Sequence, residues 1–447
     1  MKIALVSIVS ILTFLIASPN GMTASAQSTG VVLPLPIKKI SNDTLLEAYK
    51  QSISDVSHGL YLEATFGLLK RLGVESIEQI DDADVVDQWA QVMSTMTGVP
   101  TFNKAKGADF HVPKEQLAHL KLSKAAPAIE EIVKRARKTR VVILNENHLD
   151  PRGRAFGLEV ARALKPLGYT ILAVEALRPY ADDQEEHRKM KQLSADGFAR
   201  AAGDFYSGYY FDDPVFADFI RQSLAMGYHP VSYETAGRGY TDEQREEAQA
   251  DNLMRRGIQM YPEAKILIYV GERHAAERPI ASEEKPYLKL AAILKDKIGI
   301  DPLTIDQAGL SYIPMNRPDA DLYHVAASKA SSKSVVLFEQ GKPLTVGLLA
   351  GAVDLQVVHP PLKLVKGRPD WMLKMNRSPK SVPLHLLPKS GVRLVQVFDA
   401  NSAKDARPID QVLVKAGETP PALMLSDINV RYVTQDFQTQ PIGVLTK

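Results

Sequence analysis

The chain contains no cysteine among its 447 residues. This absence excludes thiol nucleophiles, zinc sites built from Cys, c-type haem attachment and lipid attachment at a Cys. The sequence also lacks an excess of one charge, because 54 Lys and Arg nearly balance 52 Asp and Glu, for a formal net charge of +2. Neither nucleic acid nor an anionic membrane surface is therefore indicated as a partner.

Several common catalytic motifs are missing as well. The sequence has no Gly-x-Ser-x-Gly elbow, no Walker loop, no Gly-x-Gly-x-x-Gly and no His-Glu-x-x-His. Serine-hydrolase, nucleotide-binding and zincin functions are therefore not favoured. What is present is an ordinary globular composition, 45% hydrophobic and 24% charged, with enough length for two or three domains.

The N-terminus has the features of a signal peptide. One Lys precedes an apolar run from Ile3 to Ala17, and Ala24-Ser25-Ala26 fits a small-x-small cleavage site. The apolar run is too short to favour a membrane span. We predict cleavage after about Ala26, a periplasmic or secreted protein, and no stable membrane insertion after cleavage.

The pattern of apolar residues divides the rest of the chain into three parts. Residues 27–125 predict a linker and then helices that pack on the main domain, from helical spacing between Asn42 and Met96. Residues 126–315 alternate strand-like and helix-like runs, which is typical of an α/β domain with three layers and a mainly parallel central sheet. Residues 316–447 predict a β-rich C-terminal extension. The strands expected in the α/β part are 140–144, 169–174, 229–233 and 265–270, and the helices are 154–165, 183–201, 213–226 and 242–261.

Each of these four strands is followed by a glutamate, namely Glu146, Glu175, Glu234 and Glu272. The carboxyl ends of parallel strands lie at one edge of a sheet, where ligands of open α/β sheets bind. Residues two apart in an extended segment point the same way, so Glu146 should lie beside His148 and Glu272 beside His274.

Carboxylates that converge in this way cannot all stay ionised without compensation. They could share protons and act as a general acid and base. A divalent metal (Mn, Co, Zn or Fe) could neutralise them, with His and Glu as ligands. Guanidinium groups are the third possibility, and the candidates are Arg178, Arg238 and Arg273.

These motifs resemble the superfamily of erythromycin esterases, ChaN-type haem-uptake lipoproteins and Tiki/TraB metalloproteases. Asn145-Glu146-Asn147-His148 matches its first motif, Gly-Glu-x-His, with Asn145 in place of Gly; we expect Asn to tolerate the positive φ of such a turn. Glu175 matches the acid after the second strand, and Gly271-Glu272-Arg273-His274 the late motif. The helix 245–252 resembles Arg-acid-x-x-Met-Ala-x-Asn, and its Arg245, Gln249 and Asn252 should share one face. The resemblance covers residues 141–275.

The resemblance implies a three-layer α/β fold with a site at the strand ends, and it leaves the activity open. Members hydrolyse esters without metal, act as metal-dependent peptidases, or bind haem. For a hydrolase acting on a small molecule or a peptide, the predicted catalytic residues are Glu146, His148, Glu175, Glu272 and His274. The metal ligands would be Glu146, His148, Glu175 and His274, and the ligand-binding residues Glu234, Arg245 and Asn252.

Two alternatives remain. A non-catalytic protein could bind haem or another bulky ligand through the aromatic segment 204–219, with Tyr206, Tyr209 and Tyr210 as the contacts. Packing of this segment on the sheet would explain its aromatic residues without a ligand. The second alternative is that the chain is an inactive scaffold, in which Asn145 marks decay of the site.

Overall fold

The computed structural model describes residues 35–100, 114–201, 206–237, 239–280, 283, 285–311 and 320–437. The predicted signal peptide, residues 1–26, lies outside these ranges. The elements described below belong to one compact unit, Ile37–Lys447. Within the described ranges, no helix is both long and apolar enough to cross a membrane.

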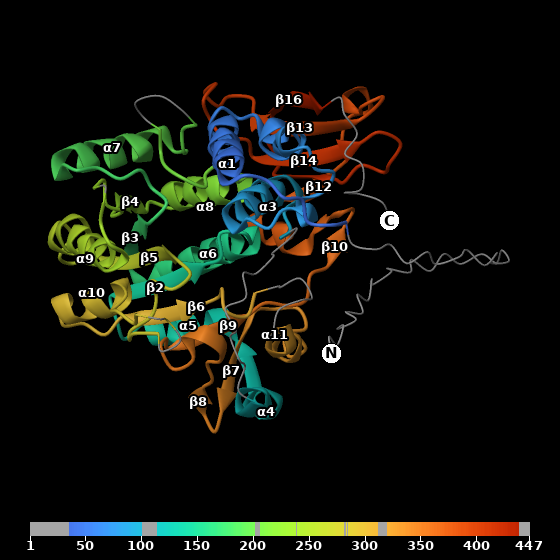
Figure 1. Cartoon of the computed structure of the whole chain (residues 1–447). Coiled ribbons are helices and arrows are strands. Elements are labelled where there is room, and N and C mark those ends of the chain that lie inside the picture. The colour runs from blue at the N-terminus through green and yellow to red at the C-terminus, as the bar shows by residue number, and fades with distance from the viewer. Residues whose placement is uncertain are drawn as a thin grey trace. The chain divides into compact units, whose positions relative to one another are not determined.

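A sheet of nine strands forms the centre of this unit (Figure 1). Its strands lie in the order β1-β7-β9-β6-β2-β5-β3-β4, with β8 beside β7. The run from β9 to β4 is parallel, and β1, β7 and β8 are antiparallel additions at one edge. The strands are β1 (Lys124–Pro127), β2 (Val141–Glu146), β3 (Tyr169–Val174), β4 (His229–Ser232), β5 (Lys265–Gly271), β6 (Leu303–Asp306), β7 (Val335–Glu339), β8 (Lys342–Pro343) and β9 (Leu355–Val358).

Helices cover both faces of the sheet, which makes three layers. Alternate residues of β2 enter different cores, because side chains of a strand point to opposite faces. Val142 and Leu144 pack with helices α5, α6 and α8, whereas Val141 and Ile143 pack with α9 and α10. The predicted α/β class with a mainly parallel sheet is confirmed. The helices are α5 (Ala128–Ala136), α6 (Pro151–Leu164), α7 (Asp183–Asp196), α8 (Pro214–Ala225), α9 (Asp242–Asn252) and α10 (Leu290–Ile298).

The predicted ends of the helices are right where a local signal exists. Thr241 and Gln244 form the capping box that their spacing indicates, and α9 begins at Asp242. Helix α7 ends at Asp196, five residues earlier than predicted, because Gly197 adopts a left-handed conformation with φ of 74°. After α9 the chain continues as a π-helix, η4 (Leu253–Gln259).

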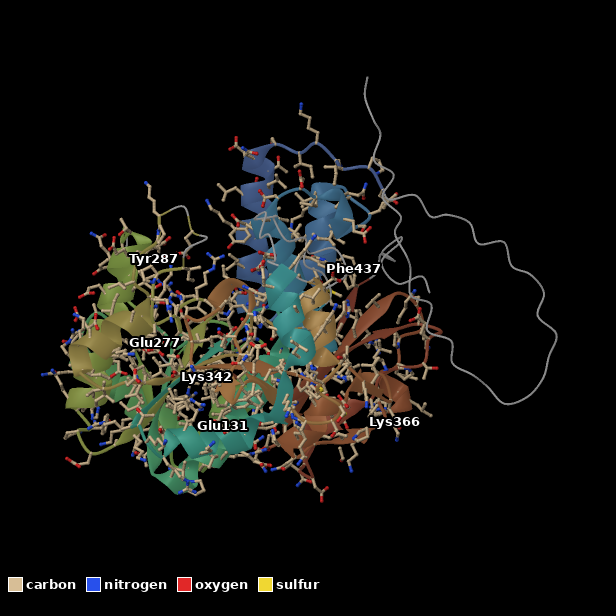
Figure 2. All side chains as sticks on the ribbon, turned by 90° about the horizontal axis from the view of Figure 1, so that it is seen from below. Glu131, Glu277, Tyr287, Lys342, Lys366 and Phe437 are labelled. Atoms are coloured by element: carbon tan, nitrogen blue, oxygen red, sulfur yellow. The ribbon has the colours of Figure 1, made fainter. Side chains whose placement is uncertain are left out.

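The N-terminal helices share a core with the C-terminal strands. Residues of α1 (Asn42–Ser57), α2 (Leu68–Leu72) and α3 (Ala83–Thr97) are buried together with Val392, Leu394 and Phe437. Figure 1 shows α1 and α3 beside β13 (Val392–Asp399), β14 (Asp410–Lys415) and β16 (Val430–Phe437). Phe437 lies next to the N-terminal helices in Figure 2, and its ring centroid is 5.7 Å from that of Phe66. The helices therefore pack on the C-terminal sheet as well as on the main domain.

The central sheet extends past the predicted end of the α/β part at residue 315. Strands β7, β8 and β9 belong to it, and β9 pairs in parallel with β6. The sequence of such short apolar runs predicts strands but not the sheet to which they belong. Pairing with strands far away in the chain decides that. The other elements are α4 (Lys114–Leu122), α11 (Ala320–Ala327), β10 (Leu364–Val365), β11 (Arg368–Pro369), β12 (Ser378–Lys380) and β15 (Leu423–Leu425).

Asn145 joins three strands at their carboxyl ends. It is fully buried within β2 and does not have a positive φ, so the expected turn is absent at this position. Its side-chain amide donates to the Glu272 carbonyl at 2.7 Å and to Asp306 at 2.8 Å. Its side-chain oxygen accepts from the Gln307 backbone N–H at 2.8 Å. Asn145 therefore connects β2 with the residues after β5 and β6.

We predict that Asn145→Ala lowers the free energy of unfolding by about 2–4 kcal/mol, because the Gln307 N–H and the Glu272 carbonyl each lose a buried partner. Urea unfolding measures the change. Asn401→Ala is the control, since Asn401 is exposed and should change stability by no more than about 0.5 kcal/mol. Equal effects of the two substitutions would contradict this role of Asn145.

Candidate functional site

The predicted site lies at the carboxyl ends of four adjacent strands. In the order β2-β5-β3-β4, these ends carry Glu146, His274, Glu175 and Glu234. Glu146 is the last residue of β2, and the other three follow their strands within three residues. The convergence that the sequence predicts therefore occurs for these four positions.

Glu146 and His148 form the pair that their spacing predicts. The Nδ1 atom of His148 lies 3.0 Å from Glu146 Oε1. Glu146 is buried, and its second oxygen accepts from Arg154 Nε at 2.8 Å and from the Tyr269 hydroxyl at 3.2 Å. With Nδ1 held in this way, Nε2 of His148 is the ring nitrogen left to face the site.

Arg154 is a central residue of the site that the sequence analysis missed. It lies in the first turn of α6, is fully buried, and also donates to Asp213 Oδ2 at 2.7 Å. The position of Arg154, eight residues after Glu146, could have indicated this contact. A helix that starts directly after the Glu-x-His motif returns its first-turn side chains to the strand end.

His274 forms a second pair, with an acid from helix α9. Its Nδ1 lies 2.8 Å from Glu246 Oε2, and its Nε2 lies 3.3 Å from Glu175 Oε1. Glu246, which is buried, also accepts from the Leu290 backbone N–H at the start of α10. Glu246 was not among the predicted site residues, although it is adjacent to Arg245 in the motif on that helix.

Glu175 lies between the two imidazoles. Its Oε2 accepts from the Gly271 backbone N–H, and its Oε1 faces His274. A Cβ atom on Gly271 would lie 3.1 Å from both Glu175 Oε2 and His148 Nε2. Glycine at 271 therefore leaves the space in which these two groups approach each other.

Arg245 neutralises the carboxylates on the β3–β4 side. It donates to Glu175 Oε1 at 2.6 Å and forms an ion pair with Glu234. Gln249 donates to Glu234 Oε2 at 2.9 Å, and Asn252 donates to the Tyr233 carbonyl at 2.9 Å. The shared face predicted for this helix is thus directed at the end of β4. Asn252 contacts only the backbone at the end of β4. Of the three side chains on this face, Arg245 is partly exposed, whereas Gln249 and Asn252 are buried.

Glu272 does not join the cluster as predicted. Residues 272–275 form a turn rather than an extended segment, so the two-residue alternation ends with β5. The Glu272 side chain is exposed, and the backbone carbonyl of this residue contacts Asn145. The partners of His274 are Glu246 and Glu175 instead.

The guanidinium groups expected to balance the charge are not the ones that do so. Arg273 pairs with Glu283 at 3.1 Å, and Arg178 lies over the Tyr180 ring. Arg238 lies outside the described residues. Arg154 and Arg245 contact the strand-end carboxylates, because helices α6 and α9 return to this edge of the sheet.

The three tyrosines predicted to contact haem are directed differently. The Tyr210 ring stacks on His148, with centroids 4.5 Å apart and an interplanar angle of 18°. Tyr209 is exposed. Tyr206 lines a hollow of about 10 Å³, which is near the smallest volume that holds one water molecule and too small for haem. The haem hypothesis stays a prediction, and Asp204 and Phe205 lie outside the described residues.

Neighbouring charges lower the pKa values of the two carboxylates, Glu146 and Glu175, and raise those of the two imidazoles, His148 and His274. Burial raises the pKa of Glu175, but the charges of His274 and Arg245 outweigh it and bring this pKa down to about 2. For Glu146, Arg154 and His148 likewise outweigh burial and lower the pKa. Burial lowers the pKa of each imidazole, yet Glu146 raises that of His148 above 6.5, and Glu175 and Glu246 raise that of His274. The site therefore favours carboxylates paired with imidazoliums.

A metal ion does not fit this arrangement. Among the residues that the structure describes, no three His, Asp or Glu side chains are grouped so that they could hold one. The oxygens of Glu146 are engaged with Arg154 and His148, and those of Glu175 with Arg245, Gly271 and His274. The metal hypothesis stays a prediction.

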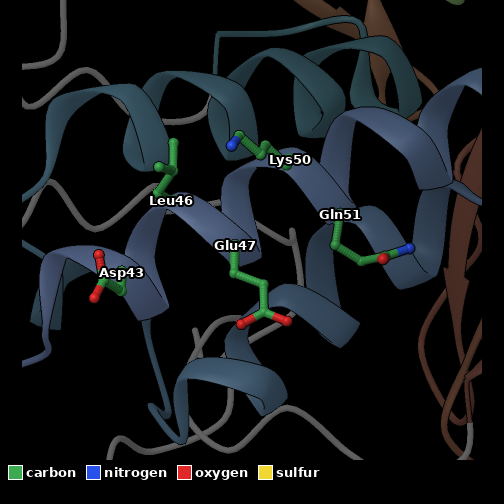
Figure 3. Close-up of a pocket in the computed structure, with 5 residues that line it drawn as sticks. All are labelled: Asp43, Leu46, Glu47, Lys50 and Gln51. Atoms are coloured by element: carbon green, nitrogen blue, oxygen red, sulfur yellow. The ribbon is translucent and has the colours of Figure 1, made fainter.

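The surface hollow in Figure 3 lies outside this site. It is lined by exposed residues of a single helix, α1, so it is a solvated helix face. These residues are Asp43, Leu46, Glu47, Lys50 and Gln51. The site at the strand ends is therefore recognised from its paired titratable groups rather than from the volume of a cavity.

Comparison with known proteins gives matches among solved structures alone. No model of a protein family matches the chain, and no curated protein matches it. The solved type III effector HopBA1 is similar over 57% of this chain and 99% of its own, at 12% identity and a TM-score of 0.29.

Two toxin structures are similar at the same level. RRSP, a MARTX toxin effector domain from Vibrio vulnificus CMCP6, matches 64% of this chain at 15% identity and a TM-score of 0.30. The C-terminal region of Pasteurella multocida toxin matches 57% at 15% identity and a TM-score of 0.29. The match spans 58% of the RRSP chain and 37% of the Pasteurella chain. Similarities this weak carry no information about activity.

Arg154→Met should lower the free energy of unfolding by about 3–5 kcal/mol, because Glu146 and Asp213 would keep buried charges without a partner. Urea unfolding measures the loss. Arg221→Ala is the matched control: Arg221 is partly exposed, and its partner Asp218 keeps Arg377, so we expect a change below about 1 kcal/mol. A small loss for Arg154→Met would show that its pairs contribute little.

The site should make stability depend on pH in two ranges. Raised imidazole pKa values stabilise the fold fully below about pH 6.5, the ordinary His value, and this contribution is lost as the pH rises through the folded-state pKa values. The lowered pKa of Glu175 contributes above about pH 4.5, and this contribution is lost as the pH falls toward 2.

Urea unfolding at about pH 5.5 and about pH 8, on either side of the ordinary His pKa, tests the imidazole part. Burial lowers the pKa of His359, which contributes with the opposite sign in both proteins. Stability at pH 8 relative to pH 5.5 should therefore be lower in the wild type than in the double variant His148→Gln/His274→Gln. The same change in both proteins would place the titrating groups elsewhere.

Proposed function

We propose that the chain is an exported hydrolase whose catalytic centre consists of two imidazoles around Glu175, acting without a metal ion. The single observation that carries this proposal is the double pairing: His148 with Glu146 and His274 with Glu246, each through Nδ1. The Nε2 atom of His274 lies 3.3 Å from Glu175 Oε1, and His148 interacts electrostatically with the same carboxylate across the space beside Gly271. The resemblance of the motifs to esterases that use His as base agrees with it.

Each buried carboxylate orients one imidazole and stabilises its charged form, as in other carboxylate–histidine pairs. Because the two imidazoles interact through Glu175, they lose their protons in two steps that belong to the pair. After the first step, one ring is neutral and the other remains charged. One can then act as a base and the other as an acid.

In the proposed reaction, the neutral imidazole takes a proton from water at Nε2, and the water oxygen adds to a carbonyl carbon. His148 is the more exposed ring, with 34% of its side chain accessible against 16% for His274, so we assign it the base. His274, as the imidazolium, gives its proton to the leaving group when the tetrahedral intermediate collapses. Arg245 lies beside His274 and faces solvent in part, where it could stabilise the developing oxyanion.

The substrate class that follows is an ester or amide of a small molecule or peptide. The experiment is a hydrolysis assay of the purified protein against p-nitrophenyl esters, lactones and a peptide mixture, with and without EDTA. We expect activity that EDTA does not change, and a loss of about 10²–10⁴-fold in His148→Gln and in His274→Gln.

Glu272→Gln is the control in this assay, because that side chain is exposed outside the cluster, and it should keep wild-type activity. No hydrolysis by the wild type beyond that of the double His variant would reject the proposal. A loss of activity with EDTA, together with about one metal ion per chain in elemental analysis, would support the metal hypothesis instead.

A further inference from the structure

The segment Ser207–Asp213 forms a loop on the site, and its conformation is constrained at several points. Tyr210, whose ring stacks on His148, has a φ of 62°, which is uncommon for a residue other than glycine. Such a conformation persists only where the surrounding structure holds it. The contacts that hold this loop therefore also hold the ring on His148.

The first part of the loop is fastened to the chain just after β3. Arg178 N–H donates to the Ser207 carbonyl, and Tyr209 N–H donates to the Ala176 carbonyl, both at 2.8 Å. Gly208 has a φ of 138°, and a Cβ there would lie 2.1 Å from the Ala176 carbonyl oxygen. This close approach aligns the loop with the residues that follow Glu175.

The last part of the loop is held from outside the α/β domain. Arg407, in the connection between β13 and β14, forms an ion pair with the Asp212 carboxylate. Tyr61, which precedes the π-helix of the N-terminal region, donates its hydroxyl to the Asp212 carbonyl at 2.9 Å. Arg407 is buried, with 4% of its side chain exposed. Asp212 thus receives one contact from the C-terminal extension and one from the N-terminal helices.

The connection between β13 and β14 also contacts Arg200 and Ala201, which lie between β3 and β4 and precede the loop. Ala201 N–H donates to the Asp405 carbonyl at 2.7 Å, and Arg200 forms an ion pair with the Asp405 carboxylate. Asp405 therefore holds residues that precede the loop, and Arg407 holds the end of the loop itself.

The residue after Asp212 leads directly into the site. Asp213 accepts from Arg154, Arg154 donates to Glu146, and Glu146 holds His148 Nδ1. Asp213 also caps helix α8 through the Val215 N–H. His148 is consequently held on two sides by one loop, through the Tyr210 ring and through the Asp213–Arg154–Glu146 series.

We propose that Arg407 is a positioning residue for His148: by fixing Asp212, it holds the Tyr210 ring on the imidazole. This gives the C-terminal extension a part in building the site, although no residue of the extension was assigned to it above. The importance of His148 to activity rests on the proposed function. The placement of its ring by Arg407 does not, so the test observes the ring itself.

The test compares Arg407→Ala with Arg393→Ala in the whole protein. Arg393 is also in the C-terminal extension and pairs with Asp436 on the same sheet, away from the loop. Proton and ¹³C NMR of His-labelled protein, assigned with His148→Asn, detects the upfield ring-current shift from Tyr210. Carbethoxylation of His148 by diethylpyrocarbonate, followed by peptide mass spectrometry, measures its accessibility.

We expect Arg407→Ala to abolish the upfield shift and to speed up modification of His148, with both unchanged in Arg393→Ala. Arg407→Lys, which keeps the charge, should restore the shift in part. A folded Arg407→Ala protein with the wild-type shift and rate would overturn the proposal.

If Arg407→Ala does not fold, Asp212→Asn replaces it. This variant removes the carboxylate of the same ion pair and keeps the backbone carbonyl that accepts from Tyr61. It should move the His148 shift and rate in the same direction, and an unchanged ring in a folded Asp212→Asn protein would overturn the proposal equally. Because neither measurement uses a substrate, failure of the hydrolase assay leaves this test interpretable.

Discussion

The burial of Glu146 constrains the rest of the site. A carboxylate taken out of water must be compensated by charge and hydrogen bonds or it becomes protonated. Arg154 and His148 supply that compensation. Since Arg154 is itself buried, it needs a second anion, which Asp213 provides from a distant loop. One buried charge at a strand end therefore determines the placement of helix α6, of the loop before α8 and of one imidazole.

The second half of the site follows the same rule with other elements. Glu175 is compensated by Arg245 and by His274, and His274 in turn is held by Glu246. Arg245 and Glu246 are neighbours on α9, so a single helix supplies both a cation and an anion to the sheet edge. The resulting arrangement has two imidazoles that are each held at Nδ1 by a buried carboxylate and that both interact with Glu175.

The C-terminal extension and the N-terminal helices have a structural relation to this site that their composition does not suggest. They share one core through Val392, Leu394 and Phe437, and both reach Asp212. The α/β layers place the strand ends, whereas the accessory parts hold the loop that lies on His148. Rigid support of this kind is what a precise arrangement of side chains requires.

The sequence by itself determined four strands of the central sheet, the three-layer class and the pairing of Glu146 with His148, because apolar periodicity and two-residue alternation are local properties. It also placed Glu175, Glu234 and His274 at the carboxyl edge, since parallel strands end together. Only the tertiary structure decided the rest. Glu272 turns outward where β5 ends, and Arg154 and Glu246 enter from helices. Strands β7 to β9 join the central sheet, and Arg407 reaches the loop. These depend on contacts between residues far apart in the chain, which no local pattern encodes.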